Sequence, residues 1–516
     1  MGEIERDIRV VTSDGVELST NVYHPDGDGP APTLLQRTCY GIAFVEGFSG
    51  IETMTAAGYR VVLQDCRGSG RSTGEPDFFS EAPDGRVAGD WIAAQPWFDG
   101  NLGTFGSSYM GFTQWAFAST KPPYLKAMSV GLFGTDRRAA WYPGGSFALD
   151  IALPWSAVRV HGVQAMGPDG AASIEKGFAH LPLAEADVLA VGQRVPWYQD
   201  WLEHAEPGDP FWSPLDFTAA LDFGMPVLLL DGWYDYQLPN MVRDLAILQR
   251  TGTPTRLVVG PWFHAGVDAD VTTAETLRWF DRHLKGDATV DTGAGAHVFV
   301  MPDGGWRDLQ SWPPRHEVKR WSLQPGGGLE RAVAPASPAT PYQYDASDPT
   351  PAFGGASLRA DHAGGVDNRE LEARDDVLTF TTDVLAEGLE VLGPVAVQLF
   401  LSSTVEHLDV FVRLCDVHPD GRSINIADGI RRLRPSDIDR AADGTFAVDV
   451  RLWPTAYRFA PGHRVRLQLS GGAHPLYARN TCSGEPLGSA ATVVVAHNAV
   501  HHDPTHPSSL LLPLAG

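Results

Sequence analysis

A serine in a turn of small residues is the strongest chemical feature of the chain. Residues 101–111 read Asn-Leu-Gly-Thr-Phe-Gly-Ser-Ser-Tyr-Met-Gly, an apolar run that ends at Gly106-Ser107-Ser108 and continues into a helix beginning near Phe112. A serine held between a strand end and a helix start is typical of a nucleophile elbow. Small neighbours let the strand and the helix approach, and the helix N-terminus stabilises negative charge. The sequence therefore predicts that the Ser108 hydroxyl attacks a carbonyl carbon.

The elbow departs from its common form, which has glycines two residues before and two residues after the serine. Gly106 stands in the first place, but Met110 occupies the second, and the next glycine is Gly111. The adjacent Ser107 is the alternative nucleophile, and in its frame the flanking residues would be the bulky Phe105 and Tyr109. We therefore favour Ser108.

A base and an orienting acid follow in the chain, in the order expected when such a serine lies in an open α/β sheet. Asp235 follows the apolar run at 227–230, and His264 follows the apolar run at 256–259. Both lie just past strand ends, where catalytic loops of such sheets are found. Asp231 is the alternative acid, but a carboxylate at the strand end before a glycine more often fixes the turn. The sequence predicts a Ser108, Asp235, His264 triad.

The elements that would position these residues alternate as in a β/α sheet up to about residue 286. Short buried strands are predicted at 33–36, 59–64, 104–105, 127–130, 227–230 and 256–259. Helical spacing of apolar residues predicts crossover helices at 85–95 and 273–284. Residues 140–222 lack strand runs and are rich in Trp, Ala and Leu, which indicates a helical cap. The predicted α/β-hydrolase domain therefore comprises residues 1–139 and 223–286, and the cap comprises residues 140–222.

Beyond residue 286 the pattern changes to short strands separated by Pro and Gly. They are predicted at 297–301, 395–401, 409–415, 446–452, 464–469 and 492–495. This pattern indicates an all-β jelly-roll sandwich over residues 287–516. Residues 325–366, rich in Gly, Pro and Ala, are expected to form a long surface excursion within it.

Composition excludes several classes of partner. A formal net charge of −24 argues against nucleic acid and anionic membranes, which need a basic surface. No leader-like N-terminus and no apolar segment of transmembrane length is present. Four cysteines without a CxxC pair signal neither a disulfide framework nor a zinc site, so a cytoplasmic location is expected.

No cofactor or metal is expected, because the sequence contains no phosphate loop, dinucleotide fingerprint or metal motif. The chain has 17 histidines. Four of them gather near the C-terminus, and we interpret them as hydrogen-bonded surface residues; they are His497, His501, His502 and His506.

The chain resembles the cocaine esterase-like (CocE/NonD) hydrolases and their relatives, the X-Pro dipeptidyl-peptidases and α-amino acid ester hydrolases. The resemblance extends over nearly the whole chain. The segments that carry it are QRTCYG (36–41), QDCRGSGRSTG (64–74), GSSYMG (106–111), DGWYD (231–235), GPWFH (260–264), WFDRHLKG (279–286), LCDVHPDGR (414–422), DGIRRLR (428–434) and HPSSLLLP (506–513). It implies an α/β-hydrolase domain with an inserted cap and a C-terminal jelly roll.

The resemblance also implies further site residues. Tyr40 is expected to donate its phenolic O–H to the oxyanion, together with the backbone N–H of Tyr109. Trp141 and Trp155 fall where these hydrolases place tryptophans over the acyl group, although packing within the cap would equally explain them. The family usually has proline where this chain has Cys39, which we interpret as a small apolar filler.

Other departures from the patterns of these families narrow the range of expected substrates. Amino acid ester hydrolases carry acidic residues after the catalytic aspartate, whereas Tyr236, Gln237 and Leu238 follow Asp235. An α-amino substrate is therefore disfavoured, and Tyr236 and Gln237 are expected to contact the substrate. The X-Pro peptidases have an additional N-terminal helical domain, for which there is no room here.

The expected function is hydrolysis of a carboxylic ester or amide of a small molecule through an acyl-enzyme on Ser108. Acyl transfer or amide cleavage by the same triad is the first alternative. A catalytically silent binding protein with a jelly roll is the second. If the chain assembles with itself, a homodimer is expected.

Overall fold

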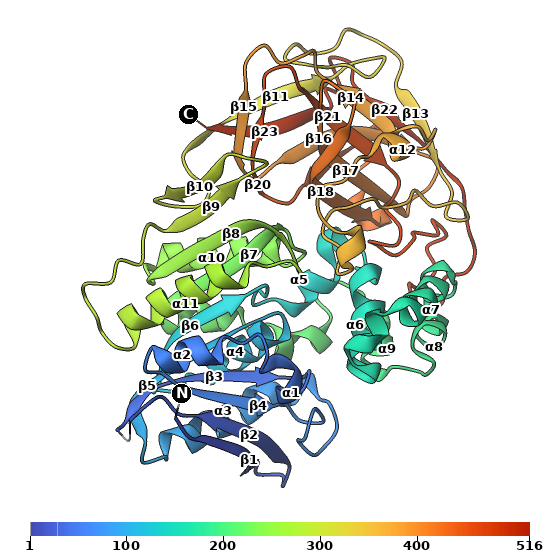
Figure 1. The fold of residues 1–516 in the computed structure, drawn as a ribbon. Helices are drawn as coiled ribbons and strands as arrows, with labels where there is room; N and C mark the ends of the chain where they lie inside the picture. Colours follow the sequence, from blue (N-terminus) through green and yellow to red (C-terminus); the bar gives the residue numbers. More distant parts are fainter. Residues whose placement is uncertain (1, 28, 516) are drawn as a thin grey trace.

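One ten-stranded sheet, of order β1-β2-β4-β3-β5-β6-β7-β8-β9-β10, organises the first part of the chain (Figure 1). The computed structural model describes residues 2–27 and 29–515. The strands from β4 to β9 pair in parallel, whereas β1, β2 and β10 join antiparallel at the two edges. The strands are β1 (Ile4–Val11), β2 (Glu17–Tyr23), β3 (Ala31–Thr38), β4 (Arg60–Asp65), β5 (Phe98–Ser107), β6 (Leu125–Gly131), β7 (Val227–Tyr234), β8 (Thr255–Phe263), β9 (Ala296–Val300) and β10 (Gly305–Leu309).

The central strands are apolar at successive positions because both faces of the sheet are covered. Leu34 and Leu228 belong to one core cluster, while the next residues, Leu35 and Leu229, belong to the other. Successive side chains of a strand point to opposite faces, so a run of apolar residues suits a sheet that is buried on both sides. The short apolar runs of the sequence therefore became the parallel strands.

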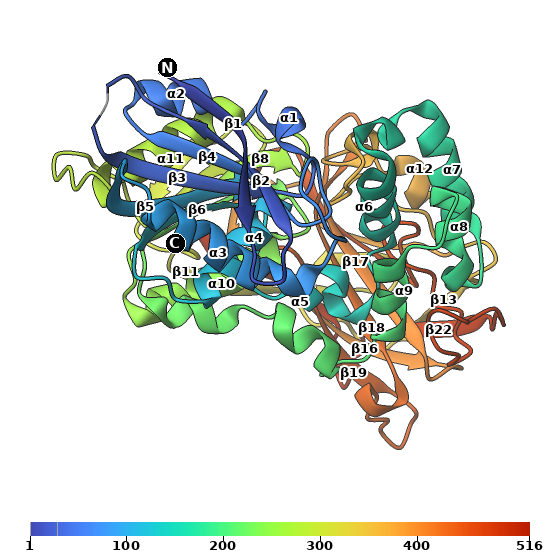
Figure 2. The same cartoon turned by 90° about the horizontal axis from the view of Figure 1, so that it is seen from below.

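Helices cover the two faces of the sheet (Figure 2). On one face lie α3 (Glu81–Ala93), α4 (Tyr109–Ser119) and α10 (Leu238–Thr251), and on the other lie α1 (Ile42–Val45), α2 (Ile51–Ala56) and α11 (Ala269–His283). The crossover helices predicted at 85–95 and 273–284 correspond to α3 and α11, each beginning about one turn earlier than predicted.

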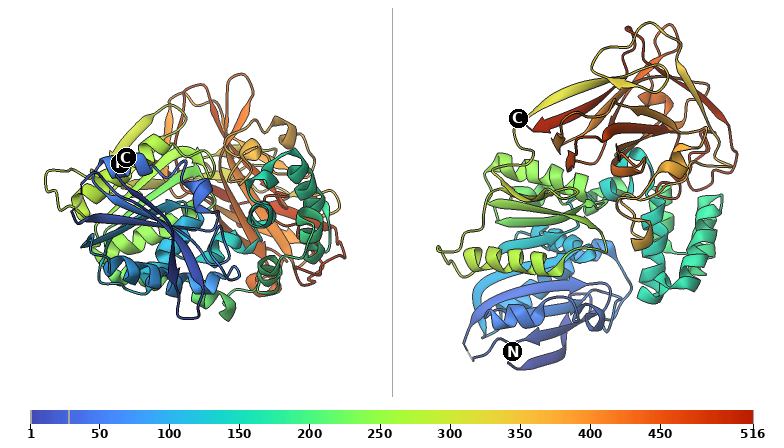
Figure 3. Two further views of the ribbon diagram at one scale, coloured as in Figure 1. Left: turned by 60° about the horizontal axis from the view of Figure 1, so that its bottom comes forward. Right: turned by 45° about the horizontal axis from the view of Figure 1, so that its top comes forward.

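A helical segment leaves the sheet after β6 and returns at β7, over the stretch where the sequence predicts a cap. Its α-helices are α5 (Arg137–Trp141), α6 (Leu149–His161), α7 (Pro168–Ala179), α8 (Ala186–Val191) and α9 (Pro196–Glu203). The helices α6 to α9 stand beside the sheet and beneath the C-terminal strands (Figure 3). No helix in the described part of the chain is both long and apolar enough to cross a membrane.

The C-terminal part is an antiparallel sandwich of a nine-stranded and a four-stranded sheet. The larger sheet contains β11 (His316–Leu323), β12 (Leu329–Glu330), β13 (Thr340–Tyr344), β15 (Leu389–Gly393), β16 (Ala396–Ser403), β19 (Phe446–Arg451), β20 (Thr455–Phe459), β22 (Ala496–His501) and β23 (Ser509–Ala515). The smaller contains β14 (Leu378–Thr381), β17 (Leu408–Val417), β18 (Ser423–Leu433) and β21 (Arg464–Ser470), and the short helix α12 (Arg369–Glu372) precedes β14. The predicted α/β-hydrolase fold with a C-terminal all-β unit is confirmed.

Two strands differ from the sequence prediction. The strand predicted at 297–301 forms as β9, but it pairs with β8 in the ten-stranded sheet and not with the sandwich. A strand pattern specifies the extended backbone and not the neighbour with which it pairs. The strand predicted at 492–495 was wrong: these residues are irregular, and β22 begins at Ala496. The domain boundaries given above stay a prediction.

Candidate active site

Ser108 lies between β5 and α4 in a backbone conformation that residues other than glycine rarely adopt. Its φ of 61° and ψ of −125° place it in a sharp turn. A Cβ on Gly106 would lie 2.6 Å from the Cβ of Met110, and one on Gly111 would lie 2.8 Å from the carbonyl oxygen of Gly131. Both positions therefore need glycine, and the shift of the second glycine to 111 follows from where α4 crosses the end of β6.

The three residues predicted as a triad meet at the carboxyl ends of neighbouring strands. The Nε2 of His264 lies 2.9 Å from the Oγ of Ser108, and its Nδ1 lies 2.6 Å from Oδ2 of Asp235. Asp235 directly follows β7 and His264 directly follows β8. Asp235 is fully buried, and its other carboxylate oxygen accepts the backbone N–H of Gln237 at 2.7 Å. This arrangement lets an imidazole take the serine proton while a carboxylate holds the opposite ring nitrogen.

The alternative residues make different contacts. Asp231 accepts the N–H of Gly232 at 2.7 Å, as expected of a residue that fixes a turn, and its second oxygen has no partner among the described residues. Burial and the nearby charge of Asp235 raise the pKa of Asp231 well above its usual range. Ser107 packs against Gly131, where an added Cβ would meet its hydroxyl. In the described part of the chain, the side chain of His264 forms its hydrogen bonds with Ser108 and Asp235 and with neither of these two residues.

Tyr40 lies beside Ser108 after β3. The indole Nε1 of Trp155 donates a hydrogen bond to the phenolic oxygen of Tyr40 at 3.1 Å, which leaves the Tyr40 O–H as a donor. Burial raises the pKa of Tyr40, although hydrogen bonds with Trp155 and Ser108 act in the opposite direction. The phenol therefore stays protonated and can donate to an oxyanion.

Tyr109 offers its backbone N–H at the first position of α4. This N–H has no acceptor among the described residues, as is usual for the first donors of a helix. The Tyr109 side chain points elsewhere and donates to the buried carboxylate of Glu81 at 2.7 Å. Glu81 in turn pairs with Arg37 at 2.7 Å. The Glu81 pair was not found from the sequence and fixes the start of the nucleophile helix from the side.

An aromatic wall lies next to these donors. Trp155 stacks on Tyr109 with ring centres 6.1 Å apart, and Trp141 meets the edge of Trp155 at 6.2 Å. Phe78, in the 3-10 turn Phe78–Ser80, contacts Trp155 at 5.9 Å. Trp201 stacks on Trp141 at 4.2 Å, so Trp141 is also part of the cap packing. The family resemblance predicted Trp141 and Trp155 here, with cap packing as the alternative, and the sequence analysis missed Phe78 and Trp201.

Tyr236 and Gln237 take different places. Tyr236 stacks on the ring of His264 with centres 4.8 Å apart, so it lies in the site. Gln237 is buried at 1% exposure, and its side-chain oxygen accepts the N–H of Gly134 at 3.3 Å. Gln237 therefore braces the loop that carries Asp235.

Cys39 is buried beside Tyr40. Burial raises the pKa of its thiol to about 12, so the thiol is neutral and unsuited to nucleophilic attack. Arg159 donates to the backbone carbonyl of Cys39. These contacts agree with the interpretation of Cys39 as an apolar filler.

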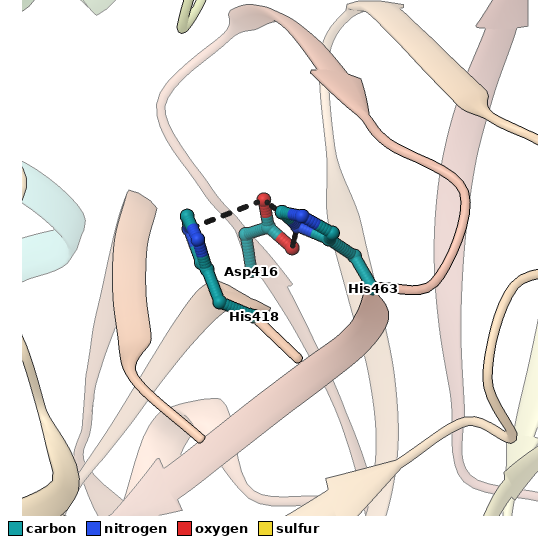
Figure 4. Close-up of side chains that lie close together, drawn as sticks. All are labelled: Asp416, His418 and His463. Carbon is teal, nitrogen blue, oxygen red and sulfur yellow. Dashed lines mark hydrogen bonds and ion pairs between the residues drawn. The ribbon is translucent and has the colours of Figure 1, made fainter. Parts of the chain in front are cut away.

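Among the described residues, the groups able to hold a metal lie in the sandwich and not beside Ser108. Asp416, His418 and His463 direct their side chains toward one another (Figure 4), with the Nδ1 of His463 2.9 Å and the Nε2 of His418 3.7 Å from the carboxylate. Asp416 also accepts the phenol of Tyr457 at 2.9 Å. The hydrogen bonds from His463 and Tyr457 therefore satisfy the buried carboxylate of Asp416 without a metal.

The second group of donors joins His501, Asp503 and His506 at the C-terminal end of the sandwich. Imidazole and carboxylate sets of this kind can hold a divalent cation. His502 instead binds Ser337 and Thr340 through its two ring nitrogens, at 3.1 and 2.9 Å. The expectation of a chain without metal stays a prediction.

Family models match both halves of the chain. Residues 14–266 match the X-Pro dipeptidyl-peptidase (S15 family), and residues 272–511 match the X-Pro dipeptidyl-peptidase C-terminal non-catalytic domain. The cocaine esterase of Rhodococcus sp. (strain MB1 Bresler) is 34% identical over 573 aligned residues, covering 99% of this chain and 98% of the relative.

Solved structures share the whole fold. An α-amino acid ester hydrolase superposes with a TM-score of 0.85 at 23% identity, covering 99% of this chain and 96% of that one. A CocE/NonD family hydrolase from Staphylococcus aureus superposes with a TM-score of 0.72 at 19% identity, covering 99% and 94%. With these matches over its full length, the chain belongs to the S15 family of X-Pro dipeptidyl-peptidases and cocaine esterase-like enzymes, and it is a serine hydrolase that acts on esters or amides.

Proposed function

We propose that the chain hydrolyses a carboxylic ester of a small molecule through an acyl-enzyme on Ser108. The observation that supports this proposal is a pair of linked hydrogen bonds, 2.9 Å from Ser108 to His264 and 2.6 Å from His264 to Asp235. His264 takes the hydroxyl proton as the Ser108 oxygen attacks the carbonyl carbon. Asp235 holds the other ring nitrogen and stabilises the imidazolium that forms.

The tetrahedral oxyanion is stabilised by the phenol of Tyr40 and the backbone N–H of Tyr109. Support comes from the unpaired N–H of Tyr109 and from the Trp155 bond at 3.1 Å, which occupies a lone pair of the Tyr40 oxygen. Donors aimed at a developing oxyanion contribute about 3–4 kcal/mol each.

Collapse of this intermediate expels the alcohol, which leaves with the proton held by His264. Water then attacks the acyl carbon, His264 accepts its proton, and the second tetrahedral intermediate releases the acid and regenerates the Ser108 hydroxyl.

Replacing the nucleophile tests the proposal. Ser108→Ala is expected to abolish turnover of p-nitrophenyl butyrate and covalent labelling by a fluorophosphonate probe, while the matched Ser107→Ala variant keeps both. Labelling of Ser108→Ala at another serine would contradict the assignment of the nucleophile.

We further propose a cytoplasmic location, supported by four buried free cysteines: Cys39, Cys66, Cys415 and Cys482. Cysteines that stay reduced suit a reducing compartment. The acidic charge of −24 supports a small-molecule substrate in preference to nucleic acid or an anionic membrane. Assembly into a homodimer stays a prediction, and a size measurement in solution would decide it.

A further inference from the structure

The guanidinium of Arg137 is buried beside the active site without a counter-ion. Arg137 opens α5 directly after Asp136 and is 2% exposed. It makes no ion pair and no side-chain hydrogen bond with the described residues 2–27 and 29–515. Its neighbour Asp136 pairs instead with Arg243 at 3.0 Å. Burying an unpaired charge is costly, so such a group calls for a partner that the folded chain does not supply.

The surroundings of Arg137 are aromatic faces of the site. Its Cζ lies 4.3 Å from the ring centre of Phe78, 4.4 Å from that of Phe112 and 5.8 Å from that of Trp141. Contacts with ring faces stabilise a cation but satisfy none of its N–H donors. The guanidinium thus keeps its full hydrogen-bonding capacity.

The same rings connect Arg137 to the residues around Ser108. Phe112 lies in the first turn of α4, where its N–H bonds the carbonyl of Ser108 at 3.1 Å. Phe78 and Trp141 both contact Trp155, whose indole donates to Tyr40. One layer of rings therefore separates the guanidinium from the proposed oxyanion donors.

The free N–H donors of Arg137 are open to a ligand. Its Nε is sealed from solvent and unpaired, whereas its two terminal nitrogens are not sealed and still make no hydrogen bond with the described residues. They must therefore border space that a water molecule can reach. A planar fork of donors facing such space matches a carboxylate, which it can bind through two parallel bonds.

The region around Arg137 carries more unpaired positive than negative charge. The buried carboxylate of Glu81, near the start of α4, is already engaged by Arg37 and Tyr109. A second guanidinium, that of Arg159, lies 5.9 Å from the Trp155 ring, and among the described residues it donates only to the Cys39 carbonyl and the Ser69 hydroxyl. The wall around Trp155 is therefore locally cationic in a chain whose net charge is −24.

We propose that Arg137 binds a carboxylate at the far end of the substrate's acyl chain, so that the enzyme prefers half-esters of dicarboxylic acids. This inference rests on the proposed function of Ser108. The alkyl part of the acyl chain would pack against Phe78, Trp141 and Trp155, and the carboxylate would replace water at the terminal nitrogens of Arg137.

Chain-matched esters test the inference on the unaltered enzyme. At pH 8, kcat/KM for the monophenyl ester of adipic acid is expected to exceed that for phenyl hexanoate by about 10-fold or more, the effect of one charge-assisted hydrogen-bonded pair. In 4-(hexanoyloxy)benzoate the carboxylate is on the leaving group instead, and no such preference is expected. A preference for the leaving-group carboxylate, or for neither, would overturn the assignment.

Variants of the two adjacent arginines separate a specific contact from a change in folding. In Arg137→Gln the ratio of kcat/KM for adipate ester over hexanoate ester is expected to fall about 10- to 100-fold. Arg138→Gln removes a charge from the same helix and should leave the ratio unchanged, since Arg138 donates to the carbonyl of Ala205 at 2.7 Å. Equal ratios in wild type and Arg137→Gln would contradict the proposal. A comparison of how strongly adipate and hexanoate compete with the substrate of the wild-type enzyme provides a second measure that needs no variant.

The two levels of proposal fail in different ways. If neither ester is hydrolysed and fluorophosphonate does not label Ser108, the proposed function is wrong. If Ser108 is labelled and phenyl hexanoate is hydrolysed without preference for the adipate ester, only the role of Arg137 is wrong.

Discussion

The indole Nε1 of Trp453, in the C-terminal sandwich, donates a hydrogen bond of 3.0 Å to the backbone carbonyl of Asp235. The two residues are 218 positions apart in the sequence. The sandwich therefore holds the loop that carries the acid of the triad, although the family match describes this part of the chain as non-catalytic. The contact predicts an effect on catalysis from a residue outside the hydrolase sheet.

Trp453→Phe should lower kcat about 3- to 10-fold with little change in KM, because it removes one buried hydrogen bond that positions Asp235. Steady-state kinetics with p-nitrophenyl butyrate provide the measurement. Trp312→Phe is the matched control, since Trp312 is also buried and its indole nitrogen has no partner among the described residues. An equal effect of both substitutions would argue against a positioning role for Trp453.

Tyr40→Phe should lower kcat about 100- to 1,000-fold, the usual cost of losing one oxyanion donor. The aromatic ring remains, so the stacking around Trp155 should persist and the melting temperature should change little. Tyr59→Phe removes a phenol that binds Asp281 at 2.7 Å on the other face of the sheet, and its kcat should stay near that of the wild type. Wild-type turnover in Tyr40→Phe would exclude the phenol from the oxyanion site.

Asp235→Asn should lower kcat about 10,000-fold by favouring the wrong tautomer of His264. Asp231→Asn is the comparison, because burial and the nearby charge of Asp235 raise the pKa of Asp231 and so favour its neutral carboxyl. An amide can replace a neutral carboxyl with little change of charge, so kcat of Asp231→Asn should stay within about 3-fold of the wild type. If Asp231→Asn lowered kcat more than Asp235→Asn, Asp231 would be the acid of the triad.

A buried histidine of the sandwich predicts how stability depends on pH. Burial, with the nearby charge of Arg479, lowers the pKa of His474 from 6.5 to about 4. Since the unfolded chain takes up this proton at higher pH than the folded chain, the stability that the neutral ring provides is present above pH 6.5. It is lost as the pH falls toward 4, by up to about 3 kcal/mol.

Urea unfolding of wild type and His474→Gln at pH 7.5 and pH 4.5 checks this linkage. The free energy of unfolding should fall more steeply with acid in the wild type than in the variant. Parallel losses in the two proteins would show that other groups account for the acid sensitivity.

The order and type of most elements of the hydrolase part could be predicted because its strands are apolar on both sides and its site residues follow strand ends. Asp235 and His264 met Ser108 for this reason. In the sandwich, sequence pattern was less informative. The Val run at 493–495 has strong β propensity, yet the hydrogen bonds of β13 and β16 select Ala496–His501 instead.

Contacts between distant segments outside the triad and its oxyanion donors could not be predicted. The aromatic faces around Arg137 come from the 3-10 turn at Phe78, from α4 and from α5, which are separated in the sequence. An arginine pair at the start of a cap helix looks like a solvated surface until its neighbours are known. Likewise, nothing in the sequence around Trp453 indicates that its indole reaches Asp235.

The extension of the parallel sheet by β9 has a consequence for how the chain unfolds. Met301, just after β9, exchanges main-chain hydrogen bonds with Ala456 and Arg458 of β20, at 2.9 and 2.8 Å. The hydrolase sheet and the sandwich are thus joined by main-chain hydrogen bonds, and separating them would break both of these bonds. Calorimetry should therefore show one cooperative endotherm, and a fragment ended at residue 286 should aggregate through the bare edge of β8.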